Sequence, residues 1–157
     1  MKLKYLFLTL ILAFFLSSAI TDNDSLKSGD LAPKITLISE DSPEILNLKD
    51  SRITLINFWS PKNPASRISN KQFSEFLRVH PETEIDFITI CMDSDTNLAQ
   101  EVINNDGINN STINLLRNQV ADRVFKDYMV EDNYASYLID KNGKILEINP
   151  DTSGLNI

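Results

Sequence analysis

The chain has 157 residues, of which 42% are hydrophobic and 24% are charged, and its formal net charge is −7 at pH 7. This composition is that of a single globular domain and excludes a disordered or collagen-like chain. An acidic chain without runs of basic residues is also a poor match for nucleic acid or anionic lipid, so we expect no nucleic-acid partner.

The first 19 residues have the pattern of an export signal. Lys2 and Lys4 form a basic start, residues 5–16 are apolar apart from Thr9, and small residues follow at positions 17–19. An uncleaved membrane anchor is the alternative, but residues 5–20 are fewer than the roughly 20 that a spanning helix needs. We therefore expect an exported protein of the periplasm or cell envelope, without membrane contact beyond this segment. The predicted organisation is a signal over residues 1–19, a flexible lead-in over 20–27, one domain over 28–150 and a tail over 151–157.

Two short strands are predicted before the centre of the chain. Residues 28–33 form a turn cluster, after which residues 34–39 alternate apolar and polar side chains as an edge strand does. A loop then leads to a second short strand around residues 44–48. These two segments are predicted to form a hairpin that leads into the next strand.

The stretch from Ile53 to Arg67 joins a buried strand to a helix. Residues 53–59 are mostly apolar, with β-branched and aromatic members, which is typical of a strand buried on both faces. Pro61 ends the strand, and Asn63 followed by Pro64 is a helix-start signal. In α/β proteins such a junction lies at the carboxyl end of the sheet, where ligands gather.

The rest of the chain is predicted to alternate between helices and strands. Residues 109–117 are ambiguous between helix and strand. The predicted elements are a helix from Asn63 to Pro81 with apolar positions Ile68, Phe73, Phe76, Leu77 and Val79, a strand Ile85–Cys91, a helix Asp93–Asn105, a helix Gln119–Tyr128 and a hairpin of strands Tyr134–Asp140 and Lys144–Ile148 around Asn142-Gly143.

Four segments in this order resemble the thioredoxin-like superfamily. Within it, they are similar to exported thiol-disulfide oxidoreductases of the group related to alkyl hydroperoxide reductase and redoxins. The resemblance implies an α/β fold with a mixed central sheet flanked by helices. The four matches are Gly29–Pro33 with the G-x-x-A-P opening, Leu48–Trp59 with the strand that ends in Asn-Phe-Trp, Tyr128–Val130 with Y-x-V, and Tyr137–Ile145 with the "fLIDkdGkI" strand and turn.

The chain departs from that pattern where the group carries its chemistry. The family has a C-x-x-C pair at the helix start, and here Asn63 and Ser66 take these two positions. Neither side chain forms a thiolate or a disulfide, so dithiol exchange has no attacking group. The family's cis-proline, which shapes its substrate groove, is replaced by Tyr134. Only nine residues follow Ile148, so we expect the C-terminal helix to be short or missing and one face of the sheet to be bare.

Cys91 is the only cysteine, so no disulfide can form within the chain. It closes a predicted buried strand, which favours a structural thiol over a redox-active one. Trp59 is interpreted as core or groove wall, with a stacking platform for a ligand as the alternative. The expected binding residues at the former active site are Trp59, Lys62, Asn63, Ser66 and Tyr134.

No metal site or cofactor is expected. Asp93, Asp95 and Asp140 together allow a cation site, but helix-capping carboxylates are favoured because the spacing matches no metal-binding loop. A Ser66 nucleophile would need a base, and His80, the only histidine, is predicted at the far end of the same helix. Residues 109–112 contain overlapping N-x-S/T sequons.

Two functional hypotheses follow. The first is a catalytically degenerate thioredoxin-like protein of the cell envelope, a binding or structural module without dithiol redox activity. Its expected partner is a protein or peptide at the former groove or at the exposed sheet face. The alternative is a divergent thiol-disulfide oxidoreductase or peroxidase that acts through Cys91 alone.

Overall fold

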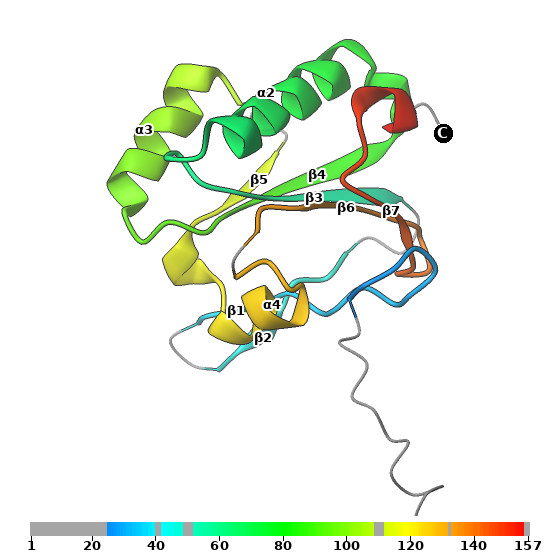
Figure 1. The fold of residues 1–157 in the computed structure, drawn as a ribbon, viewed down its shortest axis with the longest axis horizontal. Helices are drawn as coiled ribbons and strands as arrows, with labels where there is room; N and C mark the ends of the chain where they lie inside the picture. Colours follow the sequence, from blue (N-terminus) through cyan, green and yellow to red (C-terminus); the bar gives the residue numbers. More distant parts are fainter. Residues whose placement is uncertain (1–24, 40–41, 49–51, 109–111, 132, 156–157) are drawn as a thin grey trace, which may run out of the picture.

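The computed structural model describes residues 25–39, 42–48, 52–108, 112–131 and 133–155. The predicted export signal, most of the lead-in and residues 109–111 of the sequons lie outside the described residues. A central sheet separates two layers: helices α2 and α3 cover one face, and helix α4 lies with the short strands β1 and β2 on the other (Figure 1). No helix in these ranges is long and apolar enough to cross a membrane.

The sheet has five strands in the described ranges, in the order β5-β4-β3-β6-β7, with β3 at its centre. The pairing is parallel among β3, β4 and β5 and antiparallel among β3, β6 and β7, so the predicted mixed sheet is confirmed. The ambiguous segment contributes edge strand β5. The bounds are β3 Ile53–Trp59, β4 Ile85–Cys91, β5 Ile113–Leu115, β6 Ser136–Ile139 and β7 Ile145–Ile148.

The predicted first hairpin is present but forms its own small sheet. Strands β1 (Thr36–Leu37) and β2 (Glu44–Ile45) pair with each other, outside the five-stranded sheet. Their neighbour α4 (Asp122–Asp127) is shorter than the predicted helix over 119–128. The reason is that residues 120–121 are extended beside β1: Ala121 N donates to Thr36 O at 3.0 Å. A short 3-10 turn, η2 (Arg117–Gln119), precedes them.

Helix α2 (Pro64–Val79) follows β3, as predicted, and the turn η1 (Pro81–Thr83) connects it to β4. Its inner face differs from the prediction, because Ile68 and Val79 are 56% and 49% exposed. The buried positions of this helix are instead mostly polar. They are Ser66, Asn70, Phe73 and Ser74.

Helix α3 (Thr96–Asp106) covers the same face of the sheet as α2. Asp95 caps its N-terminus by accepting from Leu98 N at 3.0 Å. Gly107 ends it in the left-handed conformation, with φ of 65°, and the last helical residue, Asp106, is one residue beyond the helix end predicted at Asn105. An ion pair between Arg67 and Asp106, at 2.5 Å, joins the start of α2 to the end of α3.

The sheet face expected to be bare is covered in the described residues. The C-terminal element is short, as predicted: η3 (Thr152–Leu155) is a single 3-10 turn. It lies beside the C-terminal half of α2 (Figure 1). Leu155 is fully buried against Leu55, Phe87 and Leu138, so residues predicted to be a tail complete the core on this face.

Candidate functional site

A pocket of about 220 Å³ lies where β3 runs into α2, beside the motif positions Asn63 and Ser66. Its walls come from β3, the first turns of α2, the start of β6 and the end of β7. Most of the lining groups are neutral amides and hydroxyls. The lining residues are Asn57, Phe58, Asn63, Ala65, Ser66, Ser69, Tyr134, Ala135, Ser136 and Asn149.

Asn63 and Ser66 form the helix-start wall of the pocket. Asn63 is the N-cap of α2, and its Oδ1 accepts from Ser66 N at 2.8 Å. The Ser66 hydroxyl donates to Asn63 O at 3.2 Å and accepts from Ser60 N at 3.2 Å. The residues that replace the two cysteines therefore satisfy backbone groups that a helix start otherwise leaves without partners.

A buried chain of side-chain hydrogen bonds lies beside this wall. The Ser136 hydroxyl donates to Asn57 Oδ1 at 2.7 Å, and Asn57 Nδ2 donates to Asn70 Oδ1 at 2.9 Å. Asn57 and Asn70 are each 1% exposed, and Asn70 Nδ2 has no hydrogen-bond partner among the described residues. The chain connects β6, β3 and α2, the three elements that enclose the pocket.

This polar interior extends along one rung of the sheet. Ser136, Asn57, Thr89 and Asn114 are register partners on β6, β3, β4 and β5. The Thr89 hydroxyl donates to Asn114 Oδ1 at 2.8 Å. The sequence analysis missed this rung, although each of its first three members interrupts an apolar strand. A polar residue within an apolar strand is therefore the sequence signal that indicates this rung.

Tyr134 is at the rim of the pocket, where it is 39% exposed. The described residues contain no cis peptide bond, so the backbone at the family's cis-proline position is trans here. The next residue, Ala135, accepts a hydrogen bond from Phe58 N at 3.0 Å. The segment before β6 is thereby held against β3.

Two of the five expected binding residues lie outside the pocket. Trp59 is 1% exposed and packs in an apolar cluster with Cys91 beneath α3, so it is a core residue and neither a groove wall nor a stacking platform. Its Nε1 has no partner among the described residues. Lys62 forms an ion pair with Asp93 at 3.1 Å, away from the pocket lining.

Cys91 is fully buried at the end of β4 and does not line the pocket. Burial raises the pKa of its thiol to about 11. At neutral pH about one molecule in ten thousand then carries the reactive thiolate. This environment is that of a structural thiol.

The three carboxylates considered as a cation site are not together. Asp93 accepts from Asp95 N at 2.9 Å, and this bond, with the ammonium of Lys62, holds the pKa of Asp93 below its usual range. Asp140 shapes the β6–β7 turn by accepting from Asn142 N and Lys144 N, each at 2.8 Å. In the part of the chain that the structure describes, no three His, Cys, Asp or Glu side chains form a metal-binding group.

Asp93 and Asp140 also lie at opposite ends of β3. Asp93 follows Cys91, the partner of Trp59, whereas Asp140 follows Ile139, the partner of Thr54. The register therefore separates these two carboxylates by most of the length of the strand. This separation supports the capping interpretation.

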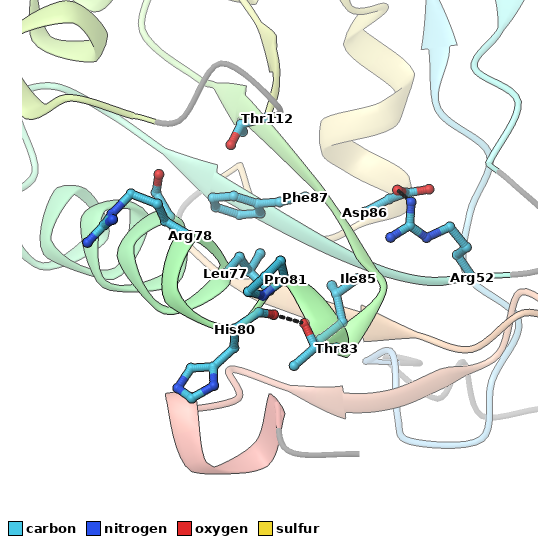
Figure 2. A pocket seen from close by; sticks show the side chains of 11 residues that line it. Arg52, Leu77, Arg78, His80, Pro81, Thr83, Ile85, Asp86, Phe87 and Thr112 are labelled. Atoms are coloured by element: carbon cyan, nitrogen blue, oxygen red, sulfur yellow. Dashed lines mark hydrogen bonds and ion pairs between the residues drawn. The ribbon is translucent and has the colours of Figure 1, made fainter.

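A larger pocket, of about 370 Å³, lies at the amino ends of β3 and β4. Figure 2 shows the His80 ring and the Arg78 guanidinium pointing away from Phe87. Each basic group at the rim already has an acidic partner: Arg52 pairs with Asp86, Arg78 with Glu75, and the His80 ring with Glu82. His80 is the C-cap of α2, at the far end from Ser66 as predicted, so the two do not form a catalytic pair.

Comparisons with known proteins identify the fold. No protein-family model matches the chain, and no curated protein matches it at a significant level. Among solved structures, a thioredoxin-like protein from Parabacteroides distasonis ATCC 8503 is 24% identical, with a TM-score of 0.67 over 83% of this chain and 93% of that one. A thiol:disulfide interchange protein DsbE from Chlorobium tepidum is 21% identical, with a TM-score of 0.64 over 80% and 86%.

A third similar structure is a secreted disulfide oxidoreductase from Mycobacterium tuberculosis. It is 19% identical, with a TM-score of 0.56 over 77% of this chain and 85% of that one. At these identities the likeness shows the fold, which is thioredoxin-like, as the motifs in the sequence predict. The function has to be argued from the site.

Proposed function

We propose that this chain is a thioredoxin-like protein of the cell envelope that has no dithiol redox activity and binds an extended polypeptide segment. The observation that carries this proposal is the pocket itself. It lies between the start of α2 and the segment before β6, and amide and hydroxyl groups line it where the family has thiols.

The absence of redox chemistry rests on two features. Asn63 and Ser66 are both committed to the start of α2, and neither can exchange a disulfide. The only thiol, Cys91, is buried, and burial raises its pKa. The alternative hypothesis, an oxidoreductase or peroxidase using Cys91, requires that thiol to reach a substrate, and no observation favours it.

An extended polypeptide is the proposed ligand because of the shape and position of the pocket. The resemblance to thioredoxin-like proteins implies that the segment at Tyr134 shapes a substrate groove. Tyr134 offers an exposed aromatic ring at the rim, and an aromatic ring with a polar end is well suited to contact a peptide. The envelope location is supported by the export pattern of residues 1–19 and by the secreted mycobacterial structure.

Restoring the two cysteines tests the redox half of the proposal. Wild-type protein is expected to reduce insulin no faster than dithiothreitol alone, with no change in Cys91→Ser. The double variant Asn63→Cys/Ser66→Cys is expected to gain insulin reduction, because it places a thiol pair at a helix start. The single variant Asn63→Cys is the matched control. Insulin reduction by the wild type that disappears in Cys91→Ser would reject the proposal.

Peptide titration tests the binding half. Reduced, carboxymethylated lactalbumin, an unfolded polypeptide, is titrated into ¹⁵N-labelled full-length protein. The amide signals of Tyr134, Ser136 and Asn149 are expected to shift, and native lactalbumin is the control without extended segments. If those signals stay unchanged at saturating polypeptide, the groove has no such ligand.

A further inference from the structure

Each serine hydroxyl in the pocket donates its proton to an acceptor within the protein. Ser66 Oγ donates to Asn63 O, Ser69 Oγ donates to Ala65 O at 3.2 Å, and Ser136 Oγ donates to Asn57 Oδ1. Each hydroxyl has one proton to donate, and each of these protons is already used inside the protein. The oxygens of Ser69 and Ser136 therefore offer lone pairs to a ligand, whereas Ser66 Oγ already accepts from Ser60 N.

The buried side-chain amides of Asn57 and Asn70 determine where the Ser136 hydroxyl donates its proton. Asn57 uses its amide nitrogen to donate to Asn70 and its oxygen to accept from Ser136. Reversing the Ser136 hydroxyl would leave Asn57 Oδ1 without this hydrogen bond in a buried site, which is unfavourable. The hydroxyl of Ser136 is therefore held as an acceptor towards the pocket.

Among the residues that the structure describes, no charged side chain lines the pocket. An ammonium or carboxylate placed there would lose its hydration without an opposite charge to replace it. An aliphatic group would cover the serine oxygens and leave their lone pairs without partners. The lining thus selects against charged and apolar groups for two different physical reasons.

We propose that the pocket selects a neutral carboxamide, the side chain of asparagine or glutamine in the bound peptide. This inference rests on the proposed function. The carboxamide NH₂ brings two donors for the oxygens of Ser69 and Ser136, whose own protons are directed to Ala65 O and Asn57 Oδ1. Its carbonyl matches the amide groups of Asn63 and Asn149, which carry N–H donors at the same pocket. A hydroxyl brings only one donor.

Four peptides that differ at one residue test the proposal. They have the sequence acetyl-Gly-Ala-X-Ala-Gly with an N-methylamide end, which avoids a second primary amide, and X is Gln, Glu, Lys or Leu. Each is titrated into ¹⁵N-labelled full-length protein while the signals of Asn57, Ser136 and Asn149 are followed. The Gln peptide is expected to bind about tenfold more tightly than the others, the value of one to two net hydrogen bonds.

Variants of the serines complete the test. Ser136→Ala is expected to remove the preference for Gln, and the half-exposed Ser69→Ala serves the same purpose if Ser136→Ala does not fold. Ser69→Asp adds a carboxylate and is expected to shift the preference towards the Lys peptide. The exposed Ser94→Ala lies outside the pocket and is expected to leave the preference unchanged.

The outcomes separate the two proposals. A Gln preference that Ser69→Ala weakens supports the carboxamide pocket. Equal binding of all four peptides at these signals overturns the carboxamide inference and leaves the peptide-binding function in place. If none of the four peptides, nor the unfolded lactalbumin, shifts the signals, the proposed function fails and the inference fails with it.

Discussion

At the centre of the sheet, neighbouring residues of β3 and β6 give the two faces opposite chemistry. On the α4 face, Phe58 of β3 packs beside Tyr137 of β6, with ring centroids 6.2 Å apart. On the α2 face, Asn57 and Ser136, each one position away along its strand, share a buried hydrogen bond. A shift of one residue along each strand therefore separates an aromatic interior from a polar one.

The aromatic face satisfies its own polar atoms. Phe58 and Tyr137 each lie with their ring centroids 5.0 Å from that of Tyr128. The Tyr128 hydroxyl donates to Pro33 O at 2.8 Å and the Tyr137 hydroxyl donates to Tyr128 O at 2.6 Å. Burial raises the pKa of both phenols, so both remain protonated donors. This face is complete without a ligand.

The hydrogen bonding around Asn57 on the α2 face is less complete. Asn70 Nδ2 has no partner among the described residues, and the pocket opens beside the hydrogen-bonded chain that Asn70 ends. Buried amides contribute less to stability than apolar side chains of the same size. Around Phe58 the α4 face is closed by aromatic packing, whereas around Asn57 the α2 face is polar and carries the pocket of the proposed function.

Phe58→Ala is expected to have the largest effect on this comparison. The change removes a ring that is fully buried among aromatic neighbours, which typically lowers the free energy of unfolding by about 3–5 kcal/mol. Urea unfolding followed by circular dichroism measures the loss. Phe58→Leu keeps most of the apolar volume and should lose clearly less. A loss below that of Asn57→Ala would reverse the assignment of the two faces.

Asn57→Ala is expected to lower the free energy of unfolding by about 1–3 kcal/mol. The reason is that the Ser136 hydroxyl and the Asn70 carbonyl both lose their partner in a buried site. The same urea titration measures it, and the double variant Asn57→Ala/Ser136→Ala shows the coupling between the two residues. Additive losses would mean that the hydrogen-bonded chain does not act as a unit.

Cys91, in the apolar cluster beneath α3, is expected to make the free energy of unfolding depend on pH. Burial places the pKa of the folded thiol at about 11, above that of a cysteine in the unfolded chain, roughly 8.5. The contribution of the buried thiol to the free energy of unfolding is therefore complete below the pKa of the unfolded state and is lost as the pH rises towards 11. Between pH 8 and 11, the free energy of unfolding of the wild type is expected to fall by about 1–2 kcal/mol more than that of Cys91→Ala. This value is smaller than the full difference between the two pKa values implies, because polar groups lie next to the thiol.

Equilibrium unfolding of the two proteins at a series of pH values measures this difference. Thiol reagents give an independent check, because Cys91 should react at neutral pH only after denaturation. Parallel stability curves for wild type and Cys91→Ala, together with rapid modification of the native protein, would contradict the buried-thiol interpretation.

Asn63→Ala is expected to have the smallest effect, about 1 kcal/mol, because it removes the side-chain cap of α2. Asn63→Asp keeps an oxygen acceptor and should retain most of the stability. Thermal unfolding of the two variants measures the difference. Equal melting temperatures for wild type and Asn63→Ala would show that the cap is unimportant to the fold, and that position 63 is free to serve binding alone.

The sequence predicts the fold well because its information is local. The strand at 53–59, the helix start at Asn63 and the hairpin turn at Asn142-Gly143 each have a signal within a few residues, and all three are present. The short β5 has no such signal, because it is an edge strand of three residues that depends on pairing with β4.

The site is predicted only in part. Asn63, Ser66 and Tyr134 line the pocket as the motif positions indicate, whereas Trp59 points into the core beneath α3. The buried chain through Asn57, Asn70 and Ser136 joins residues that are 13 and 79 positions apart along the sequence. Only the three-dimensional register brings such residues together, so no local pattern identifies them.

The position of Trp59 determines what the intrinsic fluorescence of the protein reports. It is the only tryptophan in the chain, and it lies in the cluster beneath α3, outside the pocket at the start of α2. Unfolding transfers its indole from an apolar interior to water, which moves the fluorescence emission to longer wavelength. Because Trp59 does not line the pocket, we expect a ligand there to leave the emission unchanged. Intrinsic fluorescence therefore reports whether the protein is folded and is insensitive to occupancy of the pocket.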